Sequence, residues 1–175
     1  MALYRLSCEM WLPLERAEAF AFFADAHNLH RITPPWLRFT ITTRAPITLR
    51  SGCELDYTMR WLGMPMKWRS RIARYNPPVE FEDTQIHGPY ASWWHRHTFT
   101  DSVGGTLVGD CVDYRMPWGL LGQAVHGLMV ARQLQFIFEY RQLKIAELIL
   151  GERADEACMT DPVLIRQVDE TPTPP

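Results

Sequence analysis

The stretch FEDTQIHGPYASWWHRHTFTDSVGGTLVGDCVDYRMP, residues 81–117, decides the fold. Turn residues divide it into three segments whose composition and alternation predict three consecutive antiparallel strands. The pattern then becomes helical from Trp118 to Leu150, with no linker between the two parts. Three strands that lead directly into one long helix predict a sheet that packs against that helix.

The second of these strands carries aromatic and imidazole side chains at every other position. Trp93, His95, His97 and Phe99 are two residues apart. Because successive side chains of a strand point to opposite faces of the sheet, all four share one face. Two aromatic rings and two imidazoles suit a ligand that is mostly apolar and partly polar. The pattern predicts a container and leaves its contents open.

The chain before this stretch predicts more strands and two short helices. Residues 4–12 alternate between apolar and polar, which is typical of a strand with one buried face. Residues 14–24 have helical spacing, and the segment 25–28 can begin a second short helix. Further strands are predicted at residues 36–43, 54–62, 67–75 and 79–86. The predicted fold class is α+β, with a curved antiparallel sheet of about seven strands.

The long helix repeats apolar residues at helical spacing, which predicts one face against the sheet. The expected buried positions are Leu120, Ala124, Leu128, Ala131, Leu134, Phe138, Ile145 and Leu148. Gly119, Gly122 and Gly127 lie in its first third, where each lowers helix propensity by about 1 kcal/mol relative to alanine. Two interpretations stay open, namely close packing against the sheet and a yielding helix start that admits a ligand.

The length of the chain indicates one folded unit. A chain of 175 residues is within the range of a single domain. We expect that domain over residues 1–152. Residues 153–175 carry charge, proline and little periodicity, which predicts a poorly ordered, proline-rich tail.

Charge and cysteine usage exclude several classes. The chain has 18 basic and 20 acidic residues, a net charge of −2, so no long-range field draws in nucleic acid. Its four cysteines form no C-x-x-C pair, which favours reduced thiols over a disulfide or zinc framework. Charged residues interrupt the apolar runs of the first twenty residues, unlike a signal peptide or a membrane span. We expect a cytoplasmic protein with no integral membrane span.

Several short motifs accompany this order of elements. They are Asn28-Leu29, Ile32-Thr33-Pro34-Pro35-Trp36, Gly88-Pro89-Tyr90, the W-x-H-x-H-x-F run of 93–99, Gly105-Thr106, Asp110, Tyr114 and Pro117. With them, residues 3–150 resemble the START-like or SRPBCC superfamily, which includes polyketide cyclases, lipid-transfer domains and birch-pollen-allergen-like proteins, and in particular a bacterial subgroup of it. The resemblance implies a helix-grip fold, in which two short helices follow the first strand and a long C-terminal helix lies over the concave face of the sheet.

The resemblance also implies a cavity between sheet and helix, but a fold does not supply a function. We expect the cavity to bind a hydrophobic small molecule such as a lipid, an isoprenoid or quinone, or a polyketide, and transport or presentation of that molecule stays open. The candidate cavity residues are Met10, Trp93, His95, His97, Phe99, Asp110, Tyr114 and Leu128.

The two strand histidines have one candidate partner on the next strand. If the last hairpin pairs Thr100 with Gly105, antiparallel register puts His95 opposite Asp110 on the same face. Asp110 could then orient the imidazole of His95. The pair could be a satisfied polar contact, which buried polar groups usually form, or a general base. His95 and His97 could also donate two nitrogens to a metal ion, although a third ligand would be needed.

Two further function classes stay open. An enzyme of the polyketide cyclase or dehydratase type would use His95 as acid or base with Asp110 as its orienting partner. A protein-interaction module would have its cavity filled by side chains. The residues favour a binding protein over an enzyme, and they predict no cofactor. The remaining histidines are expected at the surface or at a pocket rim: His27, His30, His87 and His126.

One group of basic residues suggests a second kind of contact. It comprises Arg60, Lys67, Arg69, Arg71 and Arg74 on two neighbouring predicted strands. We expect a solvated outer face of the sheet. The alternative is transient contact with an anionic membrane surface during ligand delivery. The oligomeric state stays open.

Overall fold

The computed structural model describes residues 1–61 and 63–169. The strands are β1 (Leu3–Leu12), β2 (Thr40–Ile41), β3 (Glu54–Trp61), β4 (Met64–Asn76), β5 (Glu80–His87), β6 (Ser92–Ser102), β7 (Gly105–Arg115) and β8 (Cys158–Val168). The helices are α1 (Arg16–Ala24), α2 (Ala26–Arg31), α3 (Gly119–Val125) and α4 (Ala131–Leu150), with the short helical segments η1 (Pro35–Leu37), η2 (His126–Val130) and η3 (Gly151–Glu156). The predicted end of the third strand, residue 62, lies outside the described residues.

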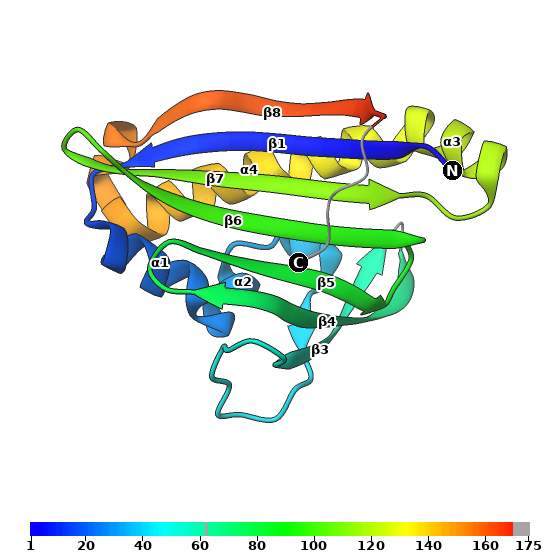
Figure 1. Ribbon diagram of the computed structural model, residues 1–175, viewed down its shortest axis with the longest axis horizontal. Coiled ribbons are helices and arrows are strands. Elements are labelled where there is room, and N and C mark those ends of the chain that lie inside the picture. Colours follow the sequence, from blue (N-terminus) through cyan, green and yellow to red (C-terminus); the bar gives the residue numbers. More distant parts are fainter. Residues whose placement is uncertain (62, 170–175) are drawn as a thin grey trace.

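The strands of the described residues form one antiparallel sheet in the order β2-β3-β4-β5-β6-β7-β1-β8. Helices α1 and α2 follow the first strand, and the long helix packs behind the sheet (Figure 1). The predicted α+β helix-grip architecture is therefore confirmed. In these residues the sheet has eight strands rather than about seven, because the chain continues into β8 after the long helix.

The hairpin between β6 and β7 is tighter than predicted. Ser102 pairs with Gly105, so only Val103 and Gly104 form the loop. Gly104 has a φ of 73°, a backbone conformation that glycine adopts without steric cost. The prediction that Thr100 pairs with Gly105 is therefore wrong by two residues in register. A shift of two keeps every side chain on its predicted face and changes only its partner.

The predicted long helix is realised as α3, η2 and α4 in direct succession. Leu134, Phe138 and Ile145 are buried as expected, whereas Leu120 and Leu128 are about four-fifths exposed (82% and 80%). Segment η2 is a π-helical turn, which adds one residue to the helix at this point. The extra residue rotates everything before it by roughly 100°, so the buried positions in the first part are Gly122, His126 and Val130 instead.

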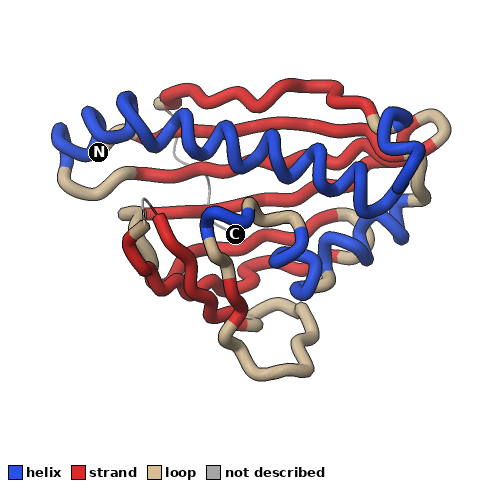
Figure 2. Tube along the Cα trace, turned by 180° about the vertical axis from the view of Figure 1, so that it is seen from behind, coloured by secondary structure: helices blue, strands red, loops and turns tan. Residues whose placement is uncertain are grey.

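The long helix crosses one half of the sheet. In Figure 2 it runs in front of the strands at the upper edge, which are β8, β1 and β7, and leaves the lower strands uncovered. The lower half curls toward the viewer and is closed by α2, η1 and the loop that follows β2. The sheet therefore has one half in contact with the helix and one half in contact with short elements.

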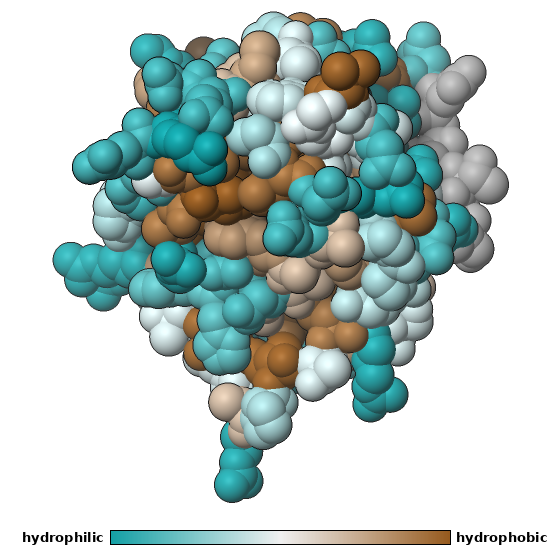
Figure 3. Space-filling model, turned by 90° about the vertical axis from the view of Figure 1, so that its left-hand side faces the viewer, coloured by the Kyte–Doolittle hydropathy of each residue, from teal (hydrophilic) through white to brown (hydrophobic). Residues whose placement is uncertain are grey.

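Apolar side chains also reach the surface. Figure 3 shows a band of them across the end of the molecule that carries α1, bordered by hydrophilic residues. On the long helix, Leu120, Leu128 and Leu143 are exposed as well. Among the described residues, no helix is long and apolar enough to cross a membrane.

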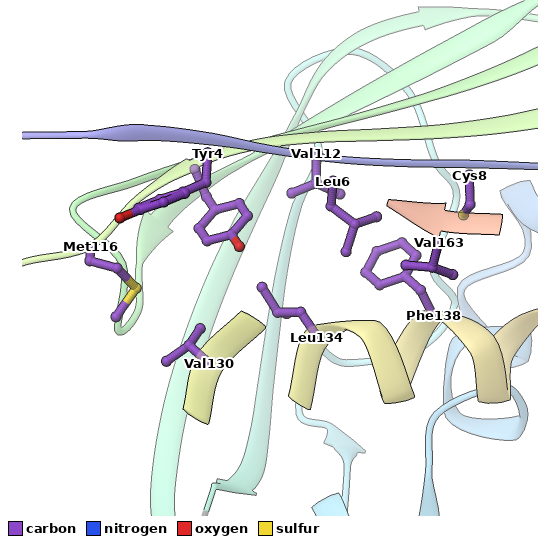
Figure 4. Close-up of a cluster of buried hydrophobic side chains, with 10 residues drawn as sticks. Tyr4, Leu6, Cys8, Val112, Met116, Val130, Leu134, Phe138 and Val163 are labelled. Atoms are coloured by element: carbon purple, nitrogen blue, oxygen red, sulfur yellow. The ribbon is translucent and has the colours of Figure 1, made fainter. Parts of the chain in front are cut away.

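The core lies where the helix meets β1, β7 and β8 (Figure 4). It is built from Tyr4, Leu6, Cys8, Val112, Tyr114, Met116, Val130, Leu134, Phe138 and Val163. The β1 members alternate with polar residues along the strand, as the sequence predicts. Burial of these side chains stabilises the fold by about 1.5–3 kcal/mol for each large aliphatic or aromatic group. A second apolar cluster around Phe20, Phe81 and Phe99 closes the end near α1.

Strand β8 corrects the prediction of a poorly ordered tail from residue 153. Residues 158–168 pair with β1, and Val163 and Ile165 pack on the core. The segment escaped prediction because most of its side chains are exposed, so its pairing rests on main-chain hydrogen bonds to β1 and not on an apolar alternation. Residues 170–175 of the predicted tail lie outside the described residues.

This arrangement gives a test of β8. Val163 is 8% exposed and Leu164, its neighbour on the opposite face, is 52% exposed. We expect Val163→Asp to lower the free energy of unfolding by roughly 3 kcal/mol or more, because it buries an unpaired carboxylate. The matched control Leu164→Asp should change it by about 0.5 kcal/mol or less. Chemical denaturation of both variants measures the difference, and equal effects would show that β8 does not cover the core.

Candidate functional site

A cavity of about 280 Å³ lies over the half of the sheet that the long helix leaves uncovered. Its walls come from β3, β4, β5 and β6, from α1, α2 and η1, from α3, η2 and one side of α4, and from residues 116–118 before α3. Of the described residues that line it, none belongs to β1, β7 or β8. The cavity is therefore the space between the curled strands and the helix that packs on their neighbours.

The strands that form the cavity wall alternate between apolar residues, which face the cavity, and charged residues, which face the solvent. Leu55, Tyr57 and Met59 on β3 face inward with Trp68 and Ser70 on β4. The outer faces of the same strands carry charged residues, including the cross-strand ion pairs Arg69–Asp56 and Arg71–Glu54, each with a closest contact of 2.7 Å. Period-two alternation thus separates an aromatic, apolar interior from a charged exterior.

Four side chains make a polar cluster at the cavity wall formed by β5 and β6. His95 Nε2 donates a hydrogen bond to Asp110 Oδ1 at 2.7 Å. His97 Nδ1 lies 2.9 Å from the same oxygen, but not along a hydrogen-bonding direction. Asp83 Oδ2 lies 3.6 Å from His95 Nδ1 and 3.9 Å from His97 Nε2. The two imidazoles therefore stand between two carboxylates, one on each neighbouring strand.

The register explains this cluster and corrects the predicted pairing. His97 lies opposite Asp110 on β7, and His95 lies opposite Val112. One carboxylate consequently reaches both imidazoles, one directly across the strand pair and one diagonally. Asp83 was missed by sequence reasoning. It is the partner of His95 on β5, and its alternation with Phe81 was the signal that could have placed it on the inner face.

Residues 12–138 match the family model described as "Polyketide cyclase / dehydrase and lipid transport". The chain belongs to this family. A search of curated protein sequences finds no match. The cavity and polar cluster described above are thus features of one member of the polyketide cyclase and lipid transport family.

Solved structures agree with the fold. Protein Ms6760 from Mycobacterium smegmatis is 18% identical, with a TM-score of 0.62 over 85% of this chain and 92% of that one. The protein TTHA0849 from Thermus thermophilus is 15% identical, with a TM-score of 0.63 over 87% and 97%. Ara h 8.0201 is 17% identical, with a TM-score of 0.56 over 79% and 95%. At these identities the likeness shows the shared fold alone.

The predicted cavity residues of this family member fall into two groups. Trp93, His95 and His97 line the cavity. The others are placed elsewhere: Met10 and Phe99 in the cluster near α1, Tyr114 in the core, Asp110 behind the histidines and Leu128 at the surface. Met10, Asp110 and Tyr114 come from β1 and β7, the half of the sheet that α4 covers, which is why they do not line the cavity.

Tyr114 has a partner that sequence reasoning assigned to the rim. His126 is buried, and its Nε2 lies 2.8 Å from the Tyr114 hydroxyl. Its ring also stacks on Tyr4 at 3.5 Å between centroids. The expected surface position of His126 is therefore wrong, because the π-helical turn rotates it onto the sheet. Burial lowers the pKa of this histidine, which favours its neutral form.

Burial and neighbouring charges set the protonation of the polar cluster. Burial, with the effect of His95, lowers the pKa of His97 to about 3. Burial alone would raise the pKa of Asp110, but His97 and His95 outweigh it and hold that pKa well below its usual value. Burial raises the pKa of Asp83, opposed by His95 and Arg141. At neutral pH the cluster therefore holds a neutral His97 beside a charged Asp110.

The basic residues of the outer face are largely paired. Arg69 and Arg71 bind Asp56 and Glu54, and Arg74 lies 3.2 Å from Glu80. Since each of these guanidinium groups faces a carboxylate, they add little net positive potential to this surface. The outer face matches the expectation of a solvated, charged exterior.

The pKa of His97 can be tested by NMR. Its ring should stay neutral from pH 8 down to about pH 4, whereas an unperturbed histidine titrates near pH 6.5. Because the unfolded chain takes up this proton at the higher pH, the folded state loses stability as pH falls from about 6.5 toward 3. The variant His97→Gln identifies the NMR signals of the His97 ring, because they disappear from its spectrum. It should also lose less folding stability than the wild type as the pH falls. A midpoint near 6.5 for His97 would contradict the burial of an uncharged ring.

Proposed function

We propose that the protein binds a compact apolar small molecule with one polar end inside the cavity over β3–β6. The observation that carries the proposal is an open cavity of about 280 Å³ whose walls are mostly apolar and aromatic, with a polar cluster at Asp83, His95 and His97. Such a cavity, with few convergent polar groups, is the usual form of a small-molecule site. Membership of the polyketide cyclase and lipid transport family supports hydrophobic ligand binding at the family level.

The shape of the walls favours a ligand with a flat or ring-shaped part. Tyr57 stacks on Trp68, and Trp68, Tyr90 and Trp93 contact one another edge to face or at a tilt. All four side chains line the cavity. Aromatic walls offer large apolar contact at small conformational cost. A quinone or isoprenoid ring, or an aromatic polyketide, fits these walls.

The size of the cavity narrows the choice further. Its volume is just below the roughly 300–1,000 Å³ found for sites that bind drug-sized ligands. A lipid with two long acyl chains is too large for it. The polar end of the ligand would lie at Asp83, His95 and His97, where the cavity offers hydrogen-bonding atoms.

One observation, the position of His95, supports the alternative that the protein is an enzyme. His95 lines the cavity, its Nε2 is held by Asp110 at 2.7 Å, and its Nδ1 lies on the side of Asp83, which also lines the cavity. A cyclase or dehydratase could use that nitrogen to move a proton on a bound substrate. His95→Gln would then abolish turnover and leave binding nearly unchanged. The interaction-module alternative requires a filled interior, and the open cavity weighs against it.

The state of the cysteines supports one compartment over others. All four, Cys8, Cys53, Cys111 and Cys158, are free thiols. Free thiols persist in reducing compartments, which supports a cytoplasmic place of action as part of the proposal.

A cavity-filling variant tests the binding function. Ala26 is buried and lines the cavity, whereas Ala21 on α1 is exposed. We expect Ala26→Leu to reduce the affinity for apolar ring compounds by about tenfold or more, because the added atoms occupy ligand space. Ala21→Leu serves as the matched control and should bind as the wild type does.

Binding can be followed by the quenching of tryptophan fluorescence, since Trp61, Trp68, Trp93 and Trp118 all line the cavity. The probes are a small quinone, a short isoprenoid alcohol and an aromatic polyketide analogue. Saturable binding in the wild type that Ala26→Leu weakens supports the proposal. Absence of binding to all three probes, or equal binding by both variants, would refute it.

A further inference from the structure

Three metal-ligating atoms from three side chains converge at the polar wall of the cavity. Asp83 Oδ2, one nitrogen of His95 and one nitrogen of His97 all lie within 4.8 Å of one another. We propose that Asp83, His95 and His97 bind one divalent transition-metal ion, with Asp110 behind both imidazoles and hydrogen-bonded to that of His95. The proposal concerns the same wall of the cavity, but it does not depend on an apolar ligand.

The backbone holds the three residues in place. His95 and His97 are two residues apart on β6 and share its inner face, and Asp83 is the cross-strand partner of His95 on β5. Sites on paired strands are held more rigidly than sites on loops. The sequence had offered two nitrogens and lacked a third ligand, and the pairing of β5 with β6 supplies the carboxylate.

The distances suit a metal after small side-chain movements. With metal–ligand bonds of about 2.0–2.2 Å, the ligands of a tetrahedral site lie roughly 3.4 Å apart. Asp83 Oδ2 lies 3.6 Å from His95 Nδ1 and 3.9 Å from His97 Nε2. A shift of about 1 Å or less in the side chains closes the set around an ion.

Asp110 provides the strongest argument. Its Oδ1 contacts Nε2 of His95 and Nδ1 of His97, so each imidazole turns its other nitrogen toward Asp83. His95 therefore turns its Nδ1 toward Asp83, and His97 turns its Nε2 toward Asp83. A carboxylate behind a ligating histidine fixes its tautomer and raises its basicity, as in most histidine metal sites. The hydrogen bond from His95 to Asp110 meets this condition. His97 Nδ1 lies 2.9 Å from the same oxygen without hydrogen-bond geometry, so a small rotation of the His97 ring would let one carboxylate orient both rings.

The charges of the site match a cation. Asp83 and Asp110 place two carboxylates beside the imidazoles, and Arg141 is a cationic side chain that lines the same cavity. A divalent ion would leave a small positive excess at the cavity wall. Within the described residues, Arg141 Nε is buried without a hydrogen-bond partner. An anionic or polar ligand group could therefore bind between the ion and Arg141.

The ligand set indicates the class of metal. Two imidazoles and one carboxylate suit zinc, iron, cobalt or manganese, and three protein ligands leave at least one coordination position open to the cavity. An open position allows a bound water or a ligand oxygen to be polarised by the ion. The cavity would then combine apolar walls with a Lewis acid.

The test measures metal binding in the absence of any apolar compound. Purified protein, freed of metal by a chelator, is dialysed against Zn²⁺ or Co²⁺ and analysed for bound metal. We expect one equivalent in the wild type and a loss of affinity of about 100-fold or more in Asp83→Asn and in His97→Gln. Asp110→Asn should weaken binding by about 10–100-fold, since it removes only the orienting carboxylate.

The matched control is His27→Gln. His27 Nδ1 lies 3.0 Å from Asp25 in an exposed pair, which resembles the buried pair without its third ligand. This variant should bind metal as the wild type does. If a cluster variant fails to fold, the wild type still gives an answer, because bound Co²⁺ should broaden the ring signals of His95 and His97 in NMR spectra.

Three results would overturn the metal site. The first is the absence of stoichiometric Zn²⁺ and Co²⁺ binding by the wild type. The second is metal binding that Asp83→Asn and His97→Gln retain, and the third is Co²⁺ that leaves the His95 and His97 ring signals sharp. None of these results affects the fluorescence assay for apolar ligands, so the two proposals can fail separately.

Discussion

One helix covers only half of a wide sheet, and the rest of the structure depends on this mismatch. Leu134 and Phe138 of α4 pack on the side chains of β1, β7 and β8 and fill that space (Figure 4). The strands β3 to β6 curl past the helix and have no equivalent partner among the described residues. Close packing is favourable wherever complementary side chains exist, so an unfilled volume persists only where none reaches. The cavity is therefore a consequence of sheet width.

The polar cluster lies on the boundary between these halves. Asp83 belongs to β5 on the cavity side, the two histidines belong to β6, and Asp110 belongs to β7 under the helix. The imidazoles thus have a fixed, buried partner on one side and a cavity on the other. A polar group held in this way is fixed in position on one side, and its other side remains available to a ligand. This boundary is where polar, titratable side chains enter the wall of a mostly apolar cavity.

Local patterns in the sequence predicted the fold and the cavity residues on β6. The features that they did not predict depend on pairings between strands and on the phase of the long helix. Alternation placed Trp93, His95 and His97 on the inner face, and helical spacing gave Leu134 and Phe138. The partner of His97 depended on a two-residue turn at Val103 and Gly104, which alternation does not specify. Leu128 was misplaced because a π-helical turn changes the phase of the helix without a distinct sequence signal. Strand β8 is held mainly by backbone pairing with β1, so its side chains show no apolar alternation that would predict a strand.

A crystal of the protein pressurised with xenon tests the half-covered sheet most directly, because xenon enters dry apolar cavities. A half-covered sheet predicts density for xenon, or for a co-purified ligand, in the space lined by Leu55, Trp68 and Phe138. It predicts none between α4 and the strands β1, β7 and β8. A space over β3–β6 closed by side chains, or xenon found beneath the helix on β1, would contradict it.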